Sequence, residues 1–196
     1  PLAEIEATLA EKGQMLAFEP PHFSGATVGG CVAAGLSGPR RQQAGAVRDF
    51  MLGVKLIDGT GQVLNFGGQV MKNVAGYDLS RLLAGSLGTL GVLAEVTLKV
   101  LPRPVAEQTL VFDMNEGEAI SRLNQWGGQP LPISASFWHD GQLRLRLSGA
   151  RAGIREPDPV QGKGCSCLLK APPGPHRPHA SGSGNLTGSQ PSRPAT

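Results

Sequence analysis

Residues 92–100 alternate between apolar and polar side chains, the two-residue period of a strand with one buried face. Upstream, residues 79–83 place leucines at helical spacing, and a run with three glycines separates the two segments. The pattern predicts a short helix, a glycine turn and a half-buried strand. The positions expected on the buried face of that strand are Val92, Ala94, Val96, Leu98 and Val100.

Two helices are expected before this strand. Residues 2–12 have an amphipathic pattern that ends at Gly13, the expected C-terminal cap. Thr27 is expected to cap a short helix over residues 28–34. Gly29 and Gly30 leave the N–H groups at the start of this helix uncovered, and such groups attract phosphate.

Turn and cap signals predict a hairpin and one further helix. Apolar runs on either side of residues 58–61, which read D-G-T-G, predict a hairpin. After residue 104 we expect a strand over 108–113, then a helix capped by Asn115. Strands over 133–138 and 143–147 complete the beginning of a small α+β domain. The residues expected on the buried face of its helix are Ile120, Leu123 and Trp126.

Composition divides the chain into three regions. Residues 1–104 carry the glycine-rich segments, and residues 105–150 carry the small α+β pattern. Residues 151–196 hold eight of the sixteen prolines and no aromatic residue. A segment of this composition buries too little apolar surface to offset its chain entropy, so we expect a disordered tail.

Charge and cysteine content exclude several classes of protein. The net charge is +3, but residues 1–150 hold twelve Lys/Arg against thirteen Asp/Glu, which argues against a nucleic-acid-binding surface. No apolar run is long enough to span a membrane. Three cysteines fit a reducing, cytoplasmic compartment better than a disulfide framework.

Several polar residues have more than one interpretation. Arg40, Arg41, Arg48 and Asp49 fit a solvated loop with surface ion pairs, or an arginine that steadies a phosphate. We expect the only tyrosine, Tyr77, to pack with its hydroxyl satisfied.

We expect no metal site and identify no catalytic base. The spacing of Cys165 and Cys167 with His176 and His179 does not match a structural zinc site. The candidate bases are His22 and His139, and neither receives a role.

The motifs in their order resemble the FAD-binding domain of the vanillyl-alcohol-oxidase superfamily, also called PCMH-type. They are T-V-G-G, R-x-x-A-G-x-V-R-D, D-G-T-G, K-N-V-A-G-Y-D-L and G-S-L-G-T-L-G-V-L-A-E-V-T-L-K-V-L-P. Within it the chain is similar to the E-subunit family of glycolate oxidases. The resemblance implies an α+β fold containing the second flavin subdomain and part of the first.

FAD is the cofactor that this resemblance implies. Helix-start N–H groups suit its two phosphates, and a bare backbone suits its flat ring system. The cofactor-binding residues carried over by motif are Thr27, Val28, Gly29, Gly30, Gly35, Ser37, Gly38, Gly85, Ser86, Gly88, Thr89, Gly91 and Val92.

The implied activity is oxidation of a 2-hydroxy acid, glycolate to glyoxylate, by hydride transfer to the flavin. The implied partners are a D-type flavoprotein subunit and an iron–sulfur F-type subunit, in the cytoplasm or at the inner face of the cell membrane. D-lactate or another 2-hydroxy acid is an alternative substrate, and a non-catalytic accessory subunit is an alternative role.

The chain departs from the resembled pattern at both ends. The family's first phosphate loop, R-G-G-x-[ST], would precede residue 2 and is expected to be missing, which predicts weak or absent FAD retention. We interpret residues 151–196 as a frameshifted reading of a G+C-rich gene. Translation of the other two frames past codon 150 tests this interpretation.

Overall fold

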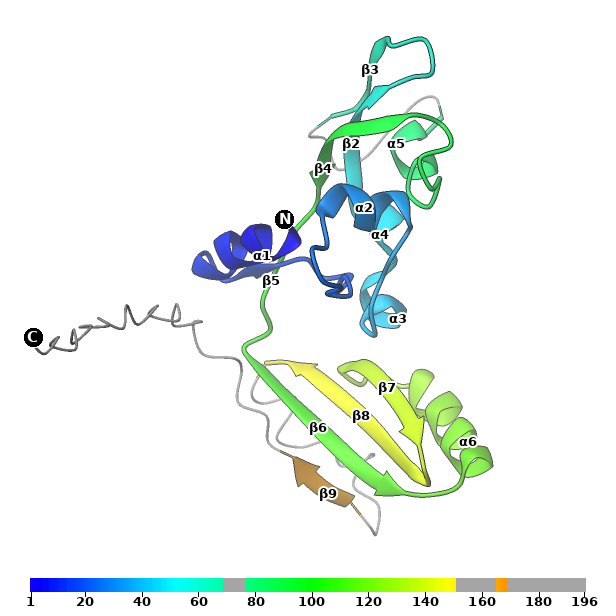
Figure 1. The fold of residues 1–196 in the computed structure, drawn as a ribbon. Helices are drawn as coiled ribbons and strands as arrows, with labels where there is room; N and C mark the ends of the chain where they lie inside the picture. The colour runs from blue at the N-terminus through cyan, green and yellow to red at the C-terminus, as the bar shows by residue number, and fades with distance from the viewer. Residues whose placement is uncertain (69–76, 151–164, 169–196) are drawn as a thin grey trace, which may run out of the picture.

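The structure, a computed structural model, describes residues 1–68, 77–150 and 165–168. Figure 1 shows two parts, one above the other, joined by the segment between β5 and β6. The upper part contains the first ten elements: α1 (Leu2–Glu11), β1 (Gln14–Met15), α2 (Val28–Ala33), α3 (Arg41–Ala44), α4 (Val47–Phe50), β2 (Met51–Ile57), β3 (Val63–Gly67), α5 (Leu79–Leu82), β4 (Val92–Leu98) and β5 (Leu101–Pro102).

The upper part is built on a three-stranded antiparallel sheet in the order β3-β2-β4. The predicted hairpin between β2 and β3 is confirmed, and Asp58 holds its turn by accepting bonds from the backbone N–H groups of Thr60 and Gln62. The predicted first helix is also confirmed: α1 is followed by Gly13 in the left-handed conformation, at φ +65°. A short pairing of β1 with β5 brings the two ends of this part together.

A bulge in β4 changes the predicted buried face. Lys55 of β2 pairs with Glu95, but the next residue, Leu56, pairs with Leu93, so that Ala94 is left without a partner on β2. One extra residue reverses the alternation. Leu93 therefore packs on the core, while Val92 is 65% exposed. The prediction was wrong for the first two positions, Val92 and Ala94, and right for the three that follow the bulge.

The core of the upper part lies between the sheet, α1 and the short helices. Phe18 and Phe50 are fully buried, and their ring centroids lie 5.5 Å apart. Lys99 places its Nζ 5.0 Å from the centre of the Phe50 ring. The apolar run before the two prolines, at residues 16–18, is thus a core segment that anchors the entry to α2.

The lower part is a four-stranded antiparallel sheet in the order β7-β8-β6-β9 with one helix. Its elements are β6 (Ala106–Asp113), α6 (Glu116–Gly127), β7 (Ile133–His139), β8 (Gln142–Gly149) and β9 (Cys165–Leu168). The predicted cap of α6 is confirmed, because Asn115 Oδ1 accepts a bond from Glu118 N at 2.9 Å. Within the stretch expected as a tail, the structure describes β9 alone.

The buried face of α6 differs by one position from the prediction. Trp126 and Leu123 pack against the sheet as expected, and Trp126 is 5.4 Å from the ring of Phe112. Ala119 is buried in the position expected for Ile120, which is 54% exposed. A small residue lets the first turn of the helix approach the sheet closely, because it adds little bulk at the contact.

The upper and lower parts have separate apolar cores in the described part of the chain, one over residues 2–101 and the other over residues 106–147. The boundary predicted between residues 104 and 105 falls between these cores and stays a prediction. No helix in the described residues is long and apolar enough to cross a membrane.

Truncation of Trp126 and of Ile120 should distinguish the buried face of α6 from its exposed face. Trp126→Ala is expected to lower the free energy of unfolding by about 3–5 kcal/mol, because it leaves a cavity in the lower core. Ile120→Ala is expected to change it by no more than about 0.5 kcal/mol. Urea denaturation of both variants measures the difference, and equal losses would show that Ile120 belongs to the core.

Candidate functional site

Two glycine-containing segments that are distant in the sequence meet through their backbones. Gly85 N donates to the carbonyl of Val32 at 3.0 Å, and Leu87 N donates to that of Ala33 at 2.8 Å. A Cβ placed on Gly35 would lie 3.1 Å from the Cα of Gly85. The turn after α5 is therefore fastened to the end of α2, and we call this pair of segments, residues 27–38 and 85–92, the glycine cradle.

The first segment of the cradle presents the start of α2. Thr27 caps the helix as predicted: its Oγ1 accepts from Gly30 N at 3.1 Å. The first bond along the helix runs from Cys31 N to the Thr27 carbonyl, so the N–H groups of Val28 and Gly29 have no partner within the helix. A Cβ on Gly29 would meet nothing within 4 Å. This turn thus offers backbone donors beside open space.

The second segment is a turn whose backbone conformation favours glycine. Gly85, Gly88 and Gly91 have φ values of +86°, +76° and +144°. Gly85 and Gly88 are exposed, and a Cβ on Gly88 would meet nothing within 4 Å. Thr89 Oγ1 donates to the Ser86 carbonyl at 2.7 Å, which turns this side chain back onto its own loop. The turn thus exposes backbone at Gly85 and Gly88, next to the exposed side chains of Leu87 and Leu90.

Three of the predicted site residues, Gly38, Gly91 and Ser37, also make contacts that stabilise the fold. A Cβ on Gly38 would lie 2.1 Å from the Glu19 carbonyl oxygen, and one on Gly91 would lie 2.5 Å from that of Ile57. Ser37 Oγ accepts from Val47 N at 2.9 Å. Packing alone accounts for the small residues there, so their contact with a cofactor stays a prediction.

The cradle fits a ligand of the FAD type. A Cβ would meet nothing within 4 Å at Gly29 in the first segment or at Gly88 in the second, and the two segments touch at Gly35 and Gly85. Phosphate groups accept bonds from such N–H groups, and a flat ring needs a surface without side chains. The donors come from individual N–H groups, because α2 has only six residues and contributes little dipole.

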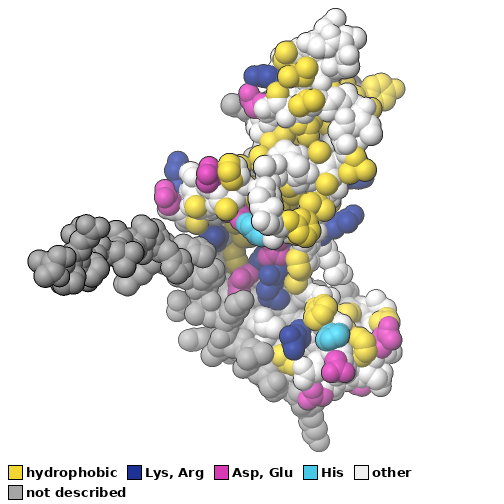
Figure 2. All heavy atoms as spheres, viewed as in Figure 1, with side chains coloured by type: hydrophobic (Ala, Val, Ile, Leu, Met, Phe, Trp, Pro, Cys, Tyr) yellow, Lys and Arg dark blue, Asp and Glu magenta, His cyan; other side chains and the backbone are white. Residues whose placement is uncertain are grey.

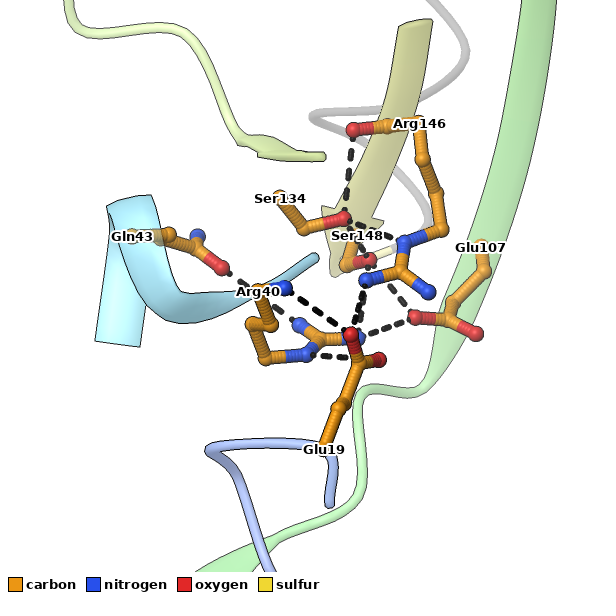
Figure 3. Close-up of polar contacts among 7 residues, drawn as sticks. All are labelled: Glu19, Arg40, Gln43, Glu107, Ser134, Arg146 and Ser148. Atoms are coloured by element: carbon orange, nitrogen blue, oxygen red, sulfur yellow. Dashed lines mark hydrogen bonds and ion pairs between the residues drawn. The ribbon is translucent and has the colours of Figure 1, made fainter. Parts of the chain in front are cut away.

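A cluster of ion pairs lies beside the cradle, between the upper and lower parts (Figure 3). Arg40, only 5% exposed, contacts the carboxylates of Glu19 and Glu107. Arg146 of β8 reaches the other oxygen of Glu19 at 2.8 Å. The prediction of a solvated loop was therefore wrong for Arg40, whose guanidinium is enclosed by carboxylates.

Hydroxyl groups complete this cluster. Ser148 Oγ donates to Glu107 at 2.7 Å, and Arg146 Nε donates to Ser134 Oγ at 2.9 Å. In the described residues, no buried side-chain nitrogen or oxygen lacks a hydrogen-bond partner. Sequence reasoning missed the residues that Arg40 contacts, because they lie on separate strands and loops and share no motif.

The other candidate residues, Tyr77, His22 and His139, make no side-chain hydrogen bond or ion pair with the cradle in the described part of the chain. Tyr77 was expected to pack, but it is 93% exposed, and the preceding motif residues 72–76 lie outside the described residues. His22 Nε2 lies 2.6 Å from a carboxylate oxygen of Glu6, and His139 stacks on Phe137 at the end of β7. Neither histidine faces the cradle residues in a contact that would support a role as base.

No group of three or more His, Cys, Asp or Glu side chains gathers to hold a metal within residues 1–68, 77–150 and 165–168. His176 and His179 lie outside the described residues. The prediction that Cys165, Cys167 and these histidines form no zinc site stays a prediction.

The Glu19 carboxyl should make stability depend on pH. Its partial burial raises the pKa, but the hydrogen bond from Arg146 and the charges of Arg146 and Arg40 outweigh burial and hold the pKa below its ordinary value of 4.5. The ionised form is favoured in the folded state, so its stabilising effect is present above pH 4.5 and is lost as pH falls through the lower folded pKa.

Urea midpoints measured from about pH 6 to about pH 3 should therefore fall more steeply for the wild-type chain than for Glu19→Gln. The matched control is Glu95→Gln, which removes an exposed ion pair with Lys55 and should keep the wild-type slope. Parallel curves for the wild type and Glu19→Gln would contradict this assignment.

Comparison with known proteins gives the cradle a family context. Residues 1–67 match the family described as "FAD binding domain". The chain is 54% identical over 156 residues to glycolate oxidase subunit GlcE of Escherichia coli, a match that spans 79% of this chain and 45% of that protein. Alkyldihydroxyacetonephosphate synthase has a similar fold, with a TM-score of 0.62, 19% identity, and coverage of 79% of this chain and 34% of that one.

Two further relatives are more distant. Glycolate oxidase subunit GlcD of Bacillus subtilis is 36% identical over 100 residues, 51% of this chain and 21% of that protein. D-lactate dehydrogenase of Archaeoglobus fulgidus is 32% identical over 143 residues, 70% of this chain and 32% of that protein. The chain thus spans less than half the length of the curated relatives it matches. Residues 1–67 of this chain therefore match an FAD-binding domain, whose cofactor is FAD, and over 79% of its length the chain is similar to the glycolate oxidase subunit GlcE.

Proposed function

We propose that this chain is the FAD-binding part of a glycolate oxidase E-type subunit. The observation that carries the proposal is the direct contact between the two segments of the glycine cradle, each of which has a glycine, Gly29 or Gly88, with open space beside its backbone. The similarity to GlcE of Escherichia coli over most of the chain supports the choice of activity.

The two segments of the cradle would bind different parts of FAD. Backbone N–H groups at Val28 and Gly29 suit the phosphates, since they have no partner within α2. The turn containing Gly85 and Gly88 suits a flat group, because these two residues expose backbone without a side chain and the neighbouring Leu87 and Leu90 expose apolar surface. When bound, FAD supplies a flavin that accepts hydride from the carbon bearing the hydroxyl of a 2-hydroxy acid, which leaves the 2-oxo acid.

The substrate class is a small 2-hydroxy acid, with glycolate as the proposed member. D-lactate is the alternative, since D-lactate dehydrogenase of Archaeoglobus fulgidus is also similar to this chain. The four-stranded sheet of the lower part would lie on the substrate side. We assign no catalytic base among the described residues.

The proposed partners are a D-type flavoprotein subunit and an iron–sulfur F-type subunit, which would receive the electrons. The relatives GlcE and GlcD are both subunits of glycolate oxidases, which supports an assembly of several chains. The proposed location is the cytoplasm or, through these partners, the inner face of the cell membrane. No polyanion-binding role is proposed, since residues 1–150 are close to neutral.

A side chain added to the open backbone of α2 should weaken FAD binding without disturbing the fold. Gly29→Val places a side chain where the free structure has open space, and it is expected to weaken FAD binding about tenfold, the equivalent of about 1.4 kcal/mol. Gly59→Val is the matched control, because Gly59 also has nothing within 4 Å of its Cβ position and lies in the distant β2–β3 turn.

Titration of flavin fluorescence, extended to about 1 mM FAD because weak binding is expected, measures both affinities. Equal affinities of Gly29→Val and Gly59→Val, at FAD concentrations where the wild-type chain binds measurably, would contradict the assignment of these site residues.

The activity is tested by expressing the chain together with D-type and F-type glycolate oxidase subunits. The expected result is a complex whose flavin absorbance bleaches on addition of glycolate, and bleaching by D-lactate alone would favour the alternative substrate. Bleaching that persists unchanged when the E-type chain carries Gly29→Val would assign turnover to the partner and give this chain an accessory role. A chain that joins no complex would overturn the proposed assembly.

A further inference from the structure

The upper and lower parts meet through the charges of the Arg40 cluster and through α3, which lies against β7, although each part has an apolar core of its own. Figure 2 shows basic and acidic side chains gathered where the two parts adjoin. Three contacts of the Arg40 cluster cross from one part to the other. They join Arg40 to Glu107, Arg40 to Ser148, and Arg146 to Glu19.

Arg40 is held firmly on its own side before it reaches across. Its backbone N donates to one oxygen of Glu19 at 2.9 Å, and its Nε donates to the other at 3.3 Å. Its Nη1 donates to Gln43 of α3 at 3.4 Å, which leaves Nη2 for Glu107 and Ser148. A planar guanidinium with five donors can satisfy partners in several directions at once, which an ammonium group cannot do in the same geometry.

The cluster is also joined to the glycine cradle. Gly38 belongs to the first segment of the cradle and lies against the backbone of Glu19, with its N–H donating to the Phe18 carbonyl at 2.8 Å. Arg40 follows Gly38 by two residues. A movement of Glu19 would therefore displace its neighbours in the cradle and also those on strands β6 and β8, which carry Glu107 and Arg146.

The chemistry of the cluster favours one orientation of the two parts. Two arginines and two glutamates balance in charge, and each is bonded to an opposite charge. A different orientation of the parts in contact would leave Arg40 enclosed with only half of its partners, and an incompletely paired buried charge is costly. Such a network specifies geometry more than it adds stability.

We propose that Arg40, Glu19, Glu107 and Arg146 form an electrostatic joint that sets the orientation of the four-stranded sheet relative to the glycine cradle. The role of these residues in positioning a substrate-side sheet over a flavin rests on the proposed function. The joint itself is a property of the chain without any ligand. A cavity of about 490 Å³ lies beside it, and Arg40, Glu19, Glu107 and Arg146 all line this cavity, so its shape depends on the joint.

Residual dipolar couplings of the backbone amides of the whole chain, recorded without FAD, test this inference. One alignment tensor is expected to fit the couplings of both parts in the wild type. In Arg40→Met the parts are expected to need two tensors, with the alignment of the lower part reduced to roughly half that of the upper part. Couplings within each part should still fit the structure of that part, which a general loss of folding would not allow.

Arg146→Met is the second variant, because Arg146 is partly exposed and its loss removes the tie between β8 and Glu19 without uncovering Arg40. If Arg40→Met does not fold, Arg146→Met alone tests the joint. The matched control is Lys55→Met, which breaks an ion pair within the upper sheet and should leave one common tensor. A single wild-type tensor in Arg146→Met and in any folded Arg40→Met would overturn the joint. Because no FAD is present, this outcome is distinguishable from failure of the proposed function.

Discussion

The upper part depends on the close approach of two backbones at Gly35 and Gly85. Both residues have positive φ, at +67° and +86°, and a Cβ on Gly35 would crowd the Cα of Gly85 at 3.1 Å. An L residue in the left-handed conformation costs about 1–2 kcal/mol even before such crowding is counted. The bonds from Gly85 and Leu87 to the end of α2 form only because the segments can come this close. The same requirement for bare backbone that closes the fold also leaves a surface on which a flat, phosphorylated cofactor can lie.

The connection between the two parts follows a different principle. Within the described residues the two apolar cores stay separate, and the contacts of the Arg40 cluster cross between them. Apolar surfaces can slide over one another with little change in energy, since burial has no preferred direction. Hydrogen-bonded ion pairs are directional, so they favour a single arrangement. A site composed of residues from both parts benefits from that restriction, because its geometry must be reproducible.

Local signals predicted most of the secondary structure, and the exceptions have identifiable causes. The caps at Thr27 and Asn115 were correct, since a cap involves residues three apart in the sequence. The face of β4 was partly wrong because the bulge at Ala94 arises from pairing with β2. Tyr77 is exposed, although an aromatic residue inside a motif is ordinarily expected to pack.

The sequence by itself determined the elements, their caps and turns, the spacing of the glycines and the resemblance to FAD-binding proteins. These features depend on residues close together in the chain, or on an ordered series of motifs. Only the tertiary structure decided which residues meet across long separations. Arg40 and Glu107 are 67 positions apart, and Glu19 and Arg146 are 127 apart. No local pattern encodes such a pair, because each charge taken alone is compatible with a solvated surface. Its burial depends on how two separately formed parts come together.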